Sequence, residues 1–234
     1  MDETQGGRHP RPEGFNDDAG EERDRFFGFS DGVFAFAATL LVVNLAPPDL
    51  RPEQLSQLPN HLQALWREAL AYAISFLVVA SYWSAHRQLF RRIRELDGGL
   101  TALNTLLLLL IAALPFPSAV LGRYATAPVA VALYASTLTA IGVLLLAIRM
   151  YALSRGLLRE PGGSQAQQAR TLHNLVYPAV FAGSIPVAYL SSPTNGMLFW
   201  LLLIPLNVLL DWLVERAHRQ SDDQSLRGAS KSNR

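Results

Sequence analysis

Cysteine is absent from this chain of 234 residues. Without thiols, the chain can form neither a disulfide framework nor a thiolate metal site. An excess of charge of one sign is also missing, because the formal net charge is only +1. Nothing in that balance indicates nucleic acid as a partner, since such proteins carry strongly basic surfaces. The N-terminal segment is polar and lacks the apolar run of a secretory signal peptide.

Motifs of the common catalytic sites are missing as well. The chain has no phosphate-binding loop, no His-Glu-x-x-His and no Gly-x-Ser-x-Gly, and no nucleophile is paired with a base. A selectivity filter of the Thr-Val-Gly-Tyr-Gly kind is also lacking. We therefore expect no enzyme, no cofactor and no resident metal ion.

Long apolar runs dominate what is present. Hydrophobic residues make up 50% of the chain, and the charged residues gather in blocks between the runs. A helix needs about 20 mainly apolar residues to cross a bilayer. The runs predict an all-α integral membrane protein with six spanning helices, at about residues 28–46, 69–85, 100–120, 128–151, 172–190 and 197–214.

Polar segments at both ends bound this membrane domain. We predict a disordered cytoplasmic tail over residues 1–24, a six-helix transmembrane domain over 25–215 and a second disordered cytoplasmic tail over 216–234.

Two local features complete the outline of the chain. The polar connection after the first span is predicted to hold a short amphipathic helix, with apolar positions at Leu55, Leu58, Leu62 and Leu65. Pro178 and Pro186 interrupt the fifth span and predict kinks there.

The positions of the basic residues predict how the chain is oriented. With six spans, both termini lie on the same side of the membrane. Of the 20 Lys and Arg residues, only Arg51, Arg67 and Arg123 fall in the connections on the other side. Cytoplasmic loops carry an excess of Lys and Arg, so the asymmetry supports six spans and predicts cytoplasmic termini.

The first span carries charge where a membrane helix seldom does. Arg25 precedes it and Asp31 lies one turn inside it. A carboxylate inside a spanning helix costs roughly 2.5–3.5 kcal/mol on insertion scales, so it needs partners. Ser30 and Asp31 are expected to meet hydrogen-bond donors on other helices, and the candidates by residue type are Arg25, Trp83, His86 and Asn104.

A different face of the same helix carries small and apolar residues. At about 100° per residue, one broad face holds Gly28, Gly32, Phe36, Thr39, Leu40 and Val43. Asp31 lies about 140° away from Phe36 on this wheel. The Gly28-x-x-x-Gly32 spacing allows a neighbouring backbone to approach closely.

More ordinary roles stay open for several of these residues. The Gly28/Gly32 pair by itself is typical of plain helix packing and says nothing of a pore. His86 can be a histidine at the membrane interface beside a basic loop, and Asn104 can be a generic interhelical contact. Asp211 is expected to pair locally near the end of the sixth span.

Motifs in the first three spans resemble those of a known family. They are Arg25-x-x-x-Phe29-Ser30-Asp31 with Thr39-Leu40-Leu41, then Trp83-Ser-Ala-His86-Arg87-x-Leu-Phe90, and then Leu103-Asn104-x-Leu with Pro115-Phe116-Pro117. In order and spacing they resemble the transmembrane protein 175 family of endosomal and lysosomal potassium channels, which has bacterial relatives. The first motif is fairly specific, and the resemblance covers residues 25–214.

This resemblance implies a potassium-permeable cation channel without a pore-loop filter, in which the first helices surround a central axis. One six-helix repeat implies the bacterial arrangement, a homotetramer in the plasma membrane. The pore constrictions are implied at Phe36, Leu40 and Val43, with a polar layer at Thr39. Phe36 departs from the family pattern, in which an aliphatic residue is usual, so the resemblance does not fix the open width of the pore.

Two other classes of membrane protein stay open from the residues alone. One is a proton-coupled transporter that uses Asp31 and His86 as a relay. The other is a membrane scaffold that transports nothing. Ion flux separates the three, because a channel gives fast flux, a coupled transporter gives saturable pH-dependent flux and a scaffold gives none.

Overall fold

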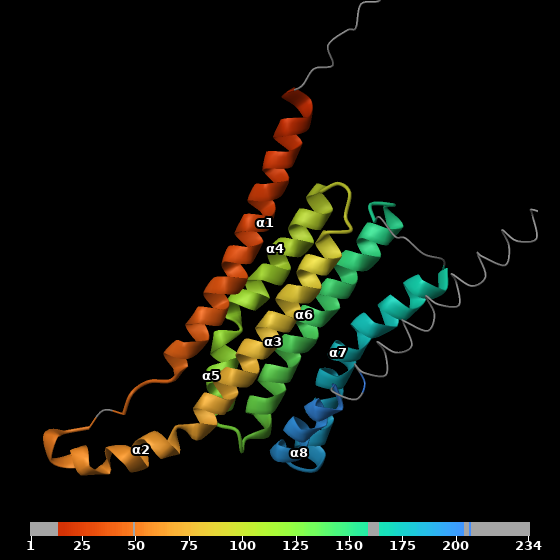
Figure 1. Cartoon of the computed structure of the whole chain (residues 1–234). Helices are drawn as coiled ribbons and strands as arrows, with labels where there is room; N and C mark the ends of the chain where they lie inside the picture. Colours follow the sequence, from red (N-terminus) through yellow and green to blue (C-terminus); the bar gives the residue numbers. More distant parts are fainter. Residues whose placement is uncertain (1–13, 49, 159–163, 204–205, 207–234) are drawn as a thin grey trace, which may run out of the picture.

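The computed structural model describes residues 14–48, 50–158, 164–203 and 206, and the regular structure in these ranges is helical (Figure 1). The one β-type pairing found there is an isolated antiparallel bridge between Ile93 and Leu158. The predicted all-α class is therefore confirmed for this part of the chain.

Eight α-helices follow one another in the described ranges. They are α1 (Gly14–Leu40), α2 (Leu58–Ala64), α3 (Trp66–Phe90), α4 (Gly98–Ala113), α5 (Pro115–Arg123), α6 (Pro128–Ser154), α7 (Ser164–Leu190) and α8 (Pro193–Leu198). Three short 3-10 helices accompany them, namely η1 (Leu41–Asn44), η2 (Pro52–Gln57) and η3 (Phe199–Leu202).

Four segments are long and apolar enough to cross a membrane, and the protein is a multi-pass membrane protein. They are Gly20–Asn44, Pro52–Phe90, Gly98–Arg123 and Pro128–Ser154. These four coincide with the first four predicted spans. The fifth predicted span corresponds to the shorter apolar stretch Leu175–Leu190 of α7.

The sixth predicted span begins in α8 and η3. Residues 204–205 and 207–214 of that span, with Asn207 and Asp211, lie outside the described residues. The count of six spans therefore stays a prediction.

The first helix starts earlier than the sequence analysis expected. Residues 14–24 belong to α1, so the prediction of disorder over 1–24 is wrong for this part. Two local interactions explain the difference. Arg25 forms an i,i+4 ion pair with Glu21, a pairing that supports helices. The Arg23 guanidinium donates to the carbonyls of Ile93 (2.8 Å) and Arg94 (3.0 Å), so it joins the start of α1 to the α3–α4 connection.

The third predicted span is divided into α4 and α5 at Leu114 and Pro115. Pro115 has no backbone N–H to continue the helical bonding and occupies the first turn of α5, where proline is tolerated. The side-chain amide of Asn44, at the end of η1, donates to the Pro115 carbonyl oxygen (3.1 Å). This hydrogen bond therefore fastens the end of the first span to the point at which the third span is divided.

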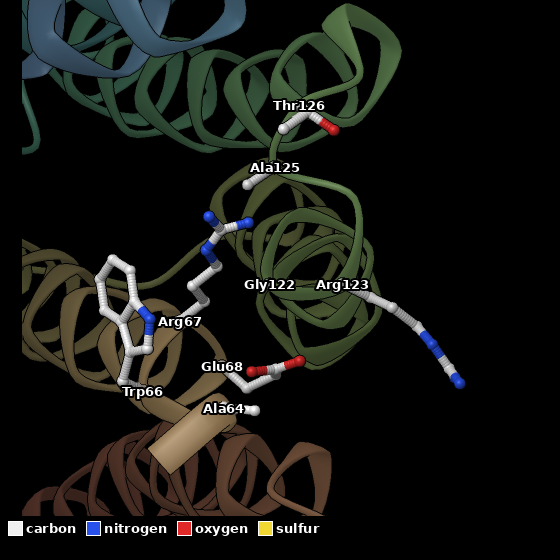
Figure 2. A pocket seen from close by; sticks show the side chains of 8 residues that line it. All are labelled: Ala64, Trp66, Arg67, Glu68, Gly122, Arg123, Ala125 and Thr126. Carbon is white, nitrogen blue, oxygen red and sulfur yellow. The ribbon is translucent and has the colours of Figure 1, made fainter. Parts of the chain in front are cut away.

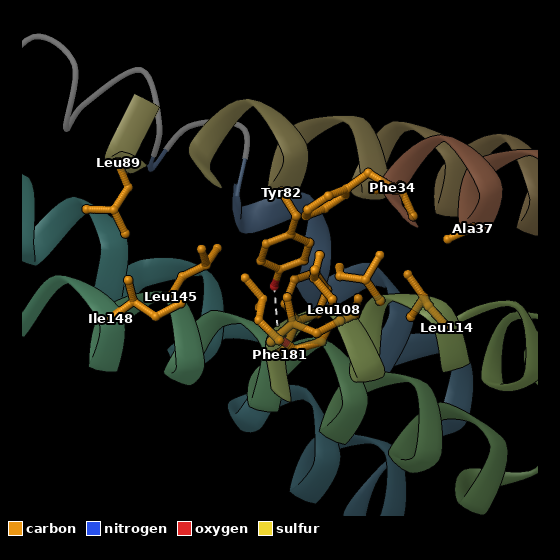
Figure 3. Packing of buried hydrophobic residues seen from close by; sticks show 14 of the residues in the cluster. Phe34, Ala37, Tyr82, Leu89, Leu108, Leu114, Leu145, Ile148 and Phe181 are labelled. Atoms are coloured by element: carbon orange, nitrogen blue, oxygen red, sulfur yellow. Dashed lines mark hydrogen bonds between the residues drawn. The ribbon is translucent and has the colours of Figure 1, made fainter. Parts of the chain in front are cut away.

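Helix α6 forms the centre of the bundle and contacts α3, α4, α5 and α7. One of its faces is buried from end to end and includes Tyr134, Leu138, Leu145 and Ile148 (Figure 3). On another side, Gly142 allows α7 to come close, since a Cβ there would lie 3.0 Å from the Cδ of Pro178.

Polar side chains fasten the core between the helices. The Tyr82 hydroxyl donates to the Leu138 carbonyl (2.8 Å), the bond drawn in Figure 3. The Ser75 hydroxyl is 2.7 Å from that of Ser118 and 3.0 Å from that of Tyr134, which joins α3, α5 and α6.

The two ends of the bundle differ in what they carry. The start of α1, the α3–α4 connection and the end of α6 lie together at one end, at the top of Figure 1. At the other end, η2 and α2 extend crosswise beside the bundle (Figure 1). A short helix in the polar connection is confirmed, although none of the residues of η2 or α2 is buried in the chain.

Candidate functional site

One side of α1 is buried against the rest of the chain. Phe34, Ala37 and Leu41 have exposed fractions of 2%, 0% and 0%. They pack where α1 and η1 contact α3, α4 and α5. These contacts fix which side of the helix is turned away from the bundle.

The side turned away is the face that the sequence analysis singled out. We call it the open face of α1 and define it by Gly28, Gly32, Phe36, Thr39, Leu40 and Val43. Phe36 is 62% exposed and Val43 is 68% exposed, while Leu40 is half-buried. A Cβ added at either glycine would meet no atom within 4 Å. The partner for the predicted close packing is therefore absent from the described part of a single chain.

Thr39 is the polar member of the open face. Its hydroxyl donates to the Phe36 carbonyl oxygen one turn back (2.8 Å), and its side chain is exposed. Because the hydroxyl proton is used inside the helix, the oxygen lone pairs remain as acceptors.

Another part of α1 contributes to a polar network, which we define as the buried residues Ser30, His86 and Asn104 and the half-buried residues Asp31 and Trp83. The indole N–H of Trp83 donates to Oδ1 of Asp31 (2.8 Å). The Asn104 amide donates to the Ser30 hydroxyl (3.1 Å), which in turn donates to the Phe26 carbonyl (3.0 Å). These bonds join α1 to α3 and α4.

Hydrogen-bond donation within the network fixes the tautomer of His86. Because the Asn104 amide nitrogen donates to Ser30, its Oδ1 accepts, and Nε2 of His86 must supply the proton across 2.8 Å. The second ring nitrogen, Nδ1, is buried and has no hydrogen-bond partner. The ring lies between Phe34 and Phe90, at centroid distances of 5.4 Å and 4.4 Å.

Arg25 does not join this network in the chain. Its guanidinium pairs with Glu21 on the exposed side of α1, and its side chain is 77% exposed. The expectation that Arg25 donates to Ser30 or Asp31 is therefore wrong here. The reason is local, since the i,i+4 carboxylate lies within reach. The charge partner of Asp31 is replaced by the neutral indole donor of Trp83.

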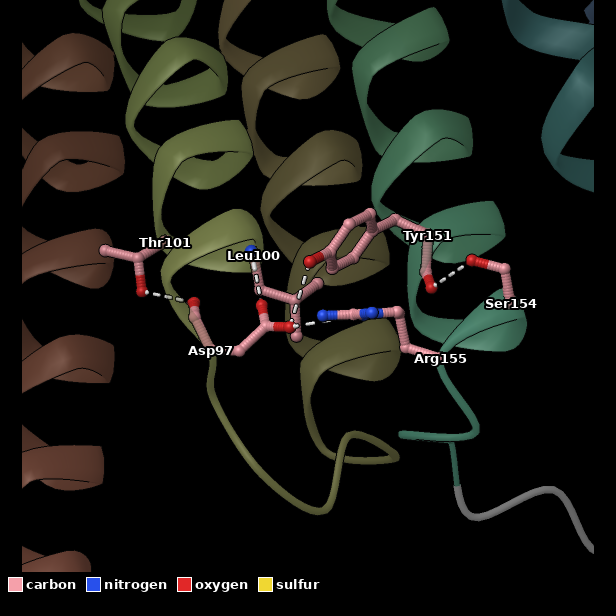
Figure 4. A network of polar contacts seen from close by, with 6 residues as sticks. All are labelled: Asp97, Leu100, Thr101, Tyr151, Ser154 and Arg155. Atoms are coloured by element: carbon pink, nitrogen blue, oxygen red, sulfur yellow. Dashed lines mark hydrogen bonds and ion pairs between the residues drawn. The ribbon is translucent and has the colours of Figure 1, made fainter.

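A second polar group, at the end of the bundle that holds the α3–α4 connection, was missed from the sequence. Asp97 caps α4 by accepting from the Leu100 N–H (2.8 Å), and Tyr151 donates to its other oxygen (2.9 Å) (Figure 4). Arg155 approaches the same oxygen at 4.0 Å. The Leu100 N–H foremost, and then Tyr151 and Arg155, lower the pKa of Asp97 below its ordinary value. Asp97 followed by two glycines was a cap signal that could have been used.

Metal coordination is not supported by the described residues, because no group of three or more His, Asp or Glu side chains there could hold an ion. The open face offers a surface for association and one hydroxyl, and the polar network offers fixed hydrogen bonds. This arrangement has the elements of a helix-lined conduit rather than of a catalytic centre.

Comparisons with known proteins agree with this chemistry. The family model described as the endosomal/lysosomal potassium channel TMEM175 matches residues 25–115, from α1 to the start of α5. A potassium channel of Streptomyces collinus is 33% identical over 186 residues, which cover 76% of this chain and 89% of that protein. The human endosomal/lysosomal proton channel TMEM175 is 29% identical over 83% of this chain and 38% of its own length.

Solved structures show the same fold. The crystal structure of a lysosomal potassium-selective channel TMEM175 homologue from Chamaesiphon minutus matches with a TM-score of 0.64 and 28% identity, over 84% of this chain and 98% of that chain. A structure of the potassium channel MtTMEM175 matches with a TM-score of 0.58 and 19% identity, over 82% and 93% of the two chains. With the bacterial relative matched over most of its length, the chain belongs to the TMEM175 family.

Proposed function

We propose that this chain forms a potassium-permeable channel in which the open face of α1 lines a central pore. The observation that carries the proposal is the two-sidedness of α1. Phe34 and Leu41 are buried in the chain, whereas Phe36 and Val43 are more than half exposed. The potassium channel of Streptomyces collinus and the potassium-selective channel from Chamaesiphon minutus support potassium as the ion.

Four copies around one axis are the assembly that we infer. A lipid-facing helix needs no glycines, whereas Gly28 and Gly32 leave room for a neighbouring backbone. The rings contributed by Phe36, Leu40 and Val43 would form apolar constrictions, which gate by excluding water. Thr39 would add a layer of acceptor oxygens between them. A phenyl ring at Phe36 makes this constriction the bulkiest of the three.

We assign the polar network a structural role, away from the ion path. Asp31 bonds to Trp83 of α3, and His86 of α3 bonds to Asn104 of α4 and is fully buried, so neither belongs to the open face. The hydrogen bonds of the polar network hold α1 at a fixed rotation about its axis and thereby direct the pore-lining side chains toward the pore. A proton relay through Asp31 and His86 is the competing assignment, and it predicts pH-coupled flux.

The orientation in the membrane follows from the basic residues. We propose one six-helix domain over 25–215 in the plasma membrane, with both termini in the cytoplasm. The start of α1 and the α3–α4 connection, which carry Arg23 and Arg94, lie at one end of the bundle. Tags at the two termini should be accessible from the cytoplasm only, and labelling from outside would contradict this orientation.

The experiment that tests the function is reconstitution of the purified chain in liposomes. We expect fast flux of K⁺ that exceeds flux of Na⁺ under matched gradients and needs no pH gradient. Flux that saturates and follows the proton gradient would identify a coupled transporter. If liposomes with the protein showed no more ion flux than empty liposomes, a membrane scaffold would be the remaining function.

A further inference from the structure

A cavity of about 410 Å³ lies at the end of the bundle that carries α2 (Figure 2). The start of α3 supplies Trp66, Arg67 and Glu68 to its wall, and the α5–α6 turn supplies Thr126. None of its lining residues belongs to α1, so the cavity is separate from the open face. Its size falls within the range of small-molecule sites, roughly 300–1,000 Å³.

Three charged residues line this cavity, namely Arg67, Glu68 and Arg123. Figure 2 shows the Arg123 side chain extending away from the other two, so Arg67 and Glu68 are the opposite charges that remain, and within the described ranges they do not pair. Oε2 of Glu68 is buried and has no hydrogen-bond partner. Arg67 lies 5.6 Å over the Trp66 ring, and no ion pair joins it to Glu68 in the part of the chain described. Figure 2 shows the Arg67 guanidinium reaching toward Ala125, while the Glu68 carboxylate lies nearer Gly122. An unpaired buried carboxylate oxygen is costly, so the site calls for a ligand with a cation for Glu68 and an anion for Arg67.

Apolar surface adjoins the cavity and indicates where such a ligand comes from. Leu70, one turn into α3, is 50% exposed, and Val129, at the start of α6, is 63% exposed. Trp66 is 58% exposed at the same level, and tryptophan is enriched where a membrane meets water. The cavity therefore lies where the headgroups of lipids packed against α3 and α6 would reach it.

We propose that this cavity binds the zwitterionic headgroup of a phosphatidylethanolamine lipid. Its ammonium donates to the Glu68 carboxylate, and its phosphate binds Arg67, with the Thr126 hydroxyl as a further donor. A choline headgroup has no N–H to donate to Glu68, and Arg67 already covers the Trp66 ring, which is the aromatic face a quaternary ammonium needs. A glycerol headgroup supplies the anion but no cation.

Lipid competition on the unmodified protein is the first test. The full chain in detergent is mixed with equal amounts of phosphatidylethanolamine, phosphatidylcholine and phosphatidylglycerol, and bound lipids are counted by native mass spectrometry. A charged hydrogen bond contributes about 1.5–3 kcal/mol, so we expect at least about tenfold higher occupancy by phosphatidylethanolamine. Equal occupancy by all three lipids, or preference for phosphatidylglycerol, would overturn the proposal.

Variants locate the bound lipid. Arg67→Gln and Glu68→Gln should each lower phosphatidylethanolamine occupancy about tenfold, because each removes one charge while the shape is nearly kept. Arg51→Gln is the matched control, because Arg51 lies at the same end of the helix bundle but does not line the cavity. If occupancy in both cavity variants stayed at the wild-type level, the lipid would be bound elsewhere and the assignment would be wrong.

A last arm separates the lipid from a free headgroup. Soluble phosphoethanolamine is added at a concentration equal to that of the lipid. The proposal expects the lipid to raise the melting temperature and the soluble headgroup to have no effect. Equal stabilisation by both would overturn the lipid assignment and point to a soluble zwitterion. None of these readouts involves ion flux, so their failure is distinct from failure of the channel assignment.

Discussion

At the scale of single residues, the bond between Trp83 and Asp31 decides how α1 is held. Hydrogen bonds to charged groups contribute about 1.5–3 kcal/mol. We expect Trp83→Phe, which removes only the N–H donor, and Asp31→Ala to lower the yield of intact assembly on size exclusion, with potassium preference changed only secondarily. Phe29→Leu is a suitable control, because Phe29 lies two residues before Asp31 and is 65% exposed.

The opposite outcome is equally clear for Asp31. If an Asp31→Ala protein assembled fully but lost its K⁺ over Na⁺ preference in liposome flux, the carboxylate would belong in the ion path. The structural assignment of the polar network would then be wrong.

Asp97 provides a residue-scale prediction of pH dependence. Its pKa in the folded protein is below the ordinary value of 3.8. The stabilisation from its charged form is therefore complete above that value and is lost as the pH falls through the lower folded pKa. We expect Asp97→Asn to melt below the wild type at pH 7 and to approach it as the pH falls below 3.8 and through the folded pKa.

Thermal melts in detergent between pH 7 and pH 3 check this expectation. Tyr151→Phe should remove part of the same difference, because it deletes one donor to the carboxylate. A melting difference between wild type and Asp97→Asn that is the same at every pH would contradict the role given to the charged form.

Residue types predicted part of the site from the sequence. From the sequence we chose three residues, Trp83, His86 and Asn104, because a carboxylate in a membrane needs hydrogen-bond donors. In the structure, Trp83 donates to Asp31. Asn104 is bonded to His86 and donates to Ser30, the neighbour of Asp31. Arg25 was misjudged because its local partner, Glu21, fell in a stretch treated as disordered. The cap that Asp97 forms on α4 is local and was overlooked. Its Tyr151 contact depends on the end of α6 coming close, which spacing alone does not show.

At the scale of elements, we expect α1 to limit the flux of potassium through the closed channel. Phe36→Ala should raise potassium flux in liposomes, since a wider apolar ring wets more easily. Thr39→Ala should change ion preference more than conductance, because it removes an oxygen from the open face. Leu109→Ala is the matched control, because Leu109 is also 63% exposed but lies on α4. Unchanged flux and selectivity in Phe36→Ala would refute the pore assignment.

Hydrophobic runs predicted the spanning elements well and their interruptions poorly. The first four spans were found near their true positions because twenty apolar residues have few alternatives in a membrane. The division of the third span at Pro115 was not foreseen, although the proline was noted. The division itself is local, because Pro115 lacks the N–H that would continue the helix. The contact that spacing could not show is tertiary, because Asn44 from another segment donates to the Pro115 carbonyl.

At the scale of the whole molecule, the glycines of α1 predict association. Gly32→Leu should leave the single chain folded, because no atom lies within 4 Å of a Cβ at this position. It should abolish the tetramer if this face packs against other copies. Light scattering coupled to size exclusion measures the mass, and Gly20→Leu, equally free of contacts within the chain, serves as control. A Gly32→Leu protein that remains tetrameric would place the interface elsewhere.

The anchor at Arg23 and the bond at Asp31 together make α1 a lever. The helix is continuous from Gly14 to Leu40, and at 1.5 Å per residue Arg23 lies about 12 Å on one side of Asp31 and Phe36 about 7.5 Å on the other. With Trp83 as the fulcrum, a sideways shift at the Arg23 end moves Phe36 in the opposite direction by about 0.6 of that distance. In the pore that we propose, a small push on the α3–α4 connection would therefore change the radius of the Phe36 ring.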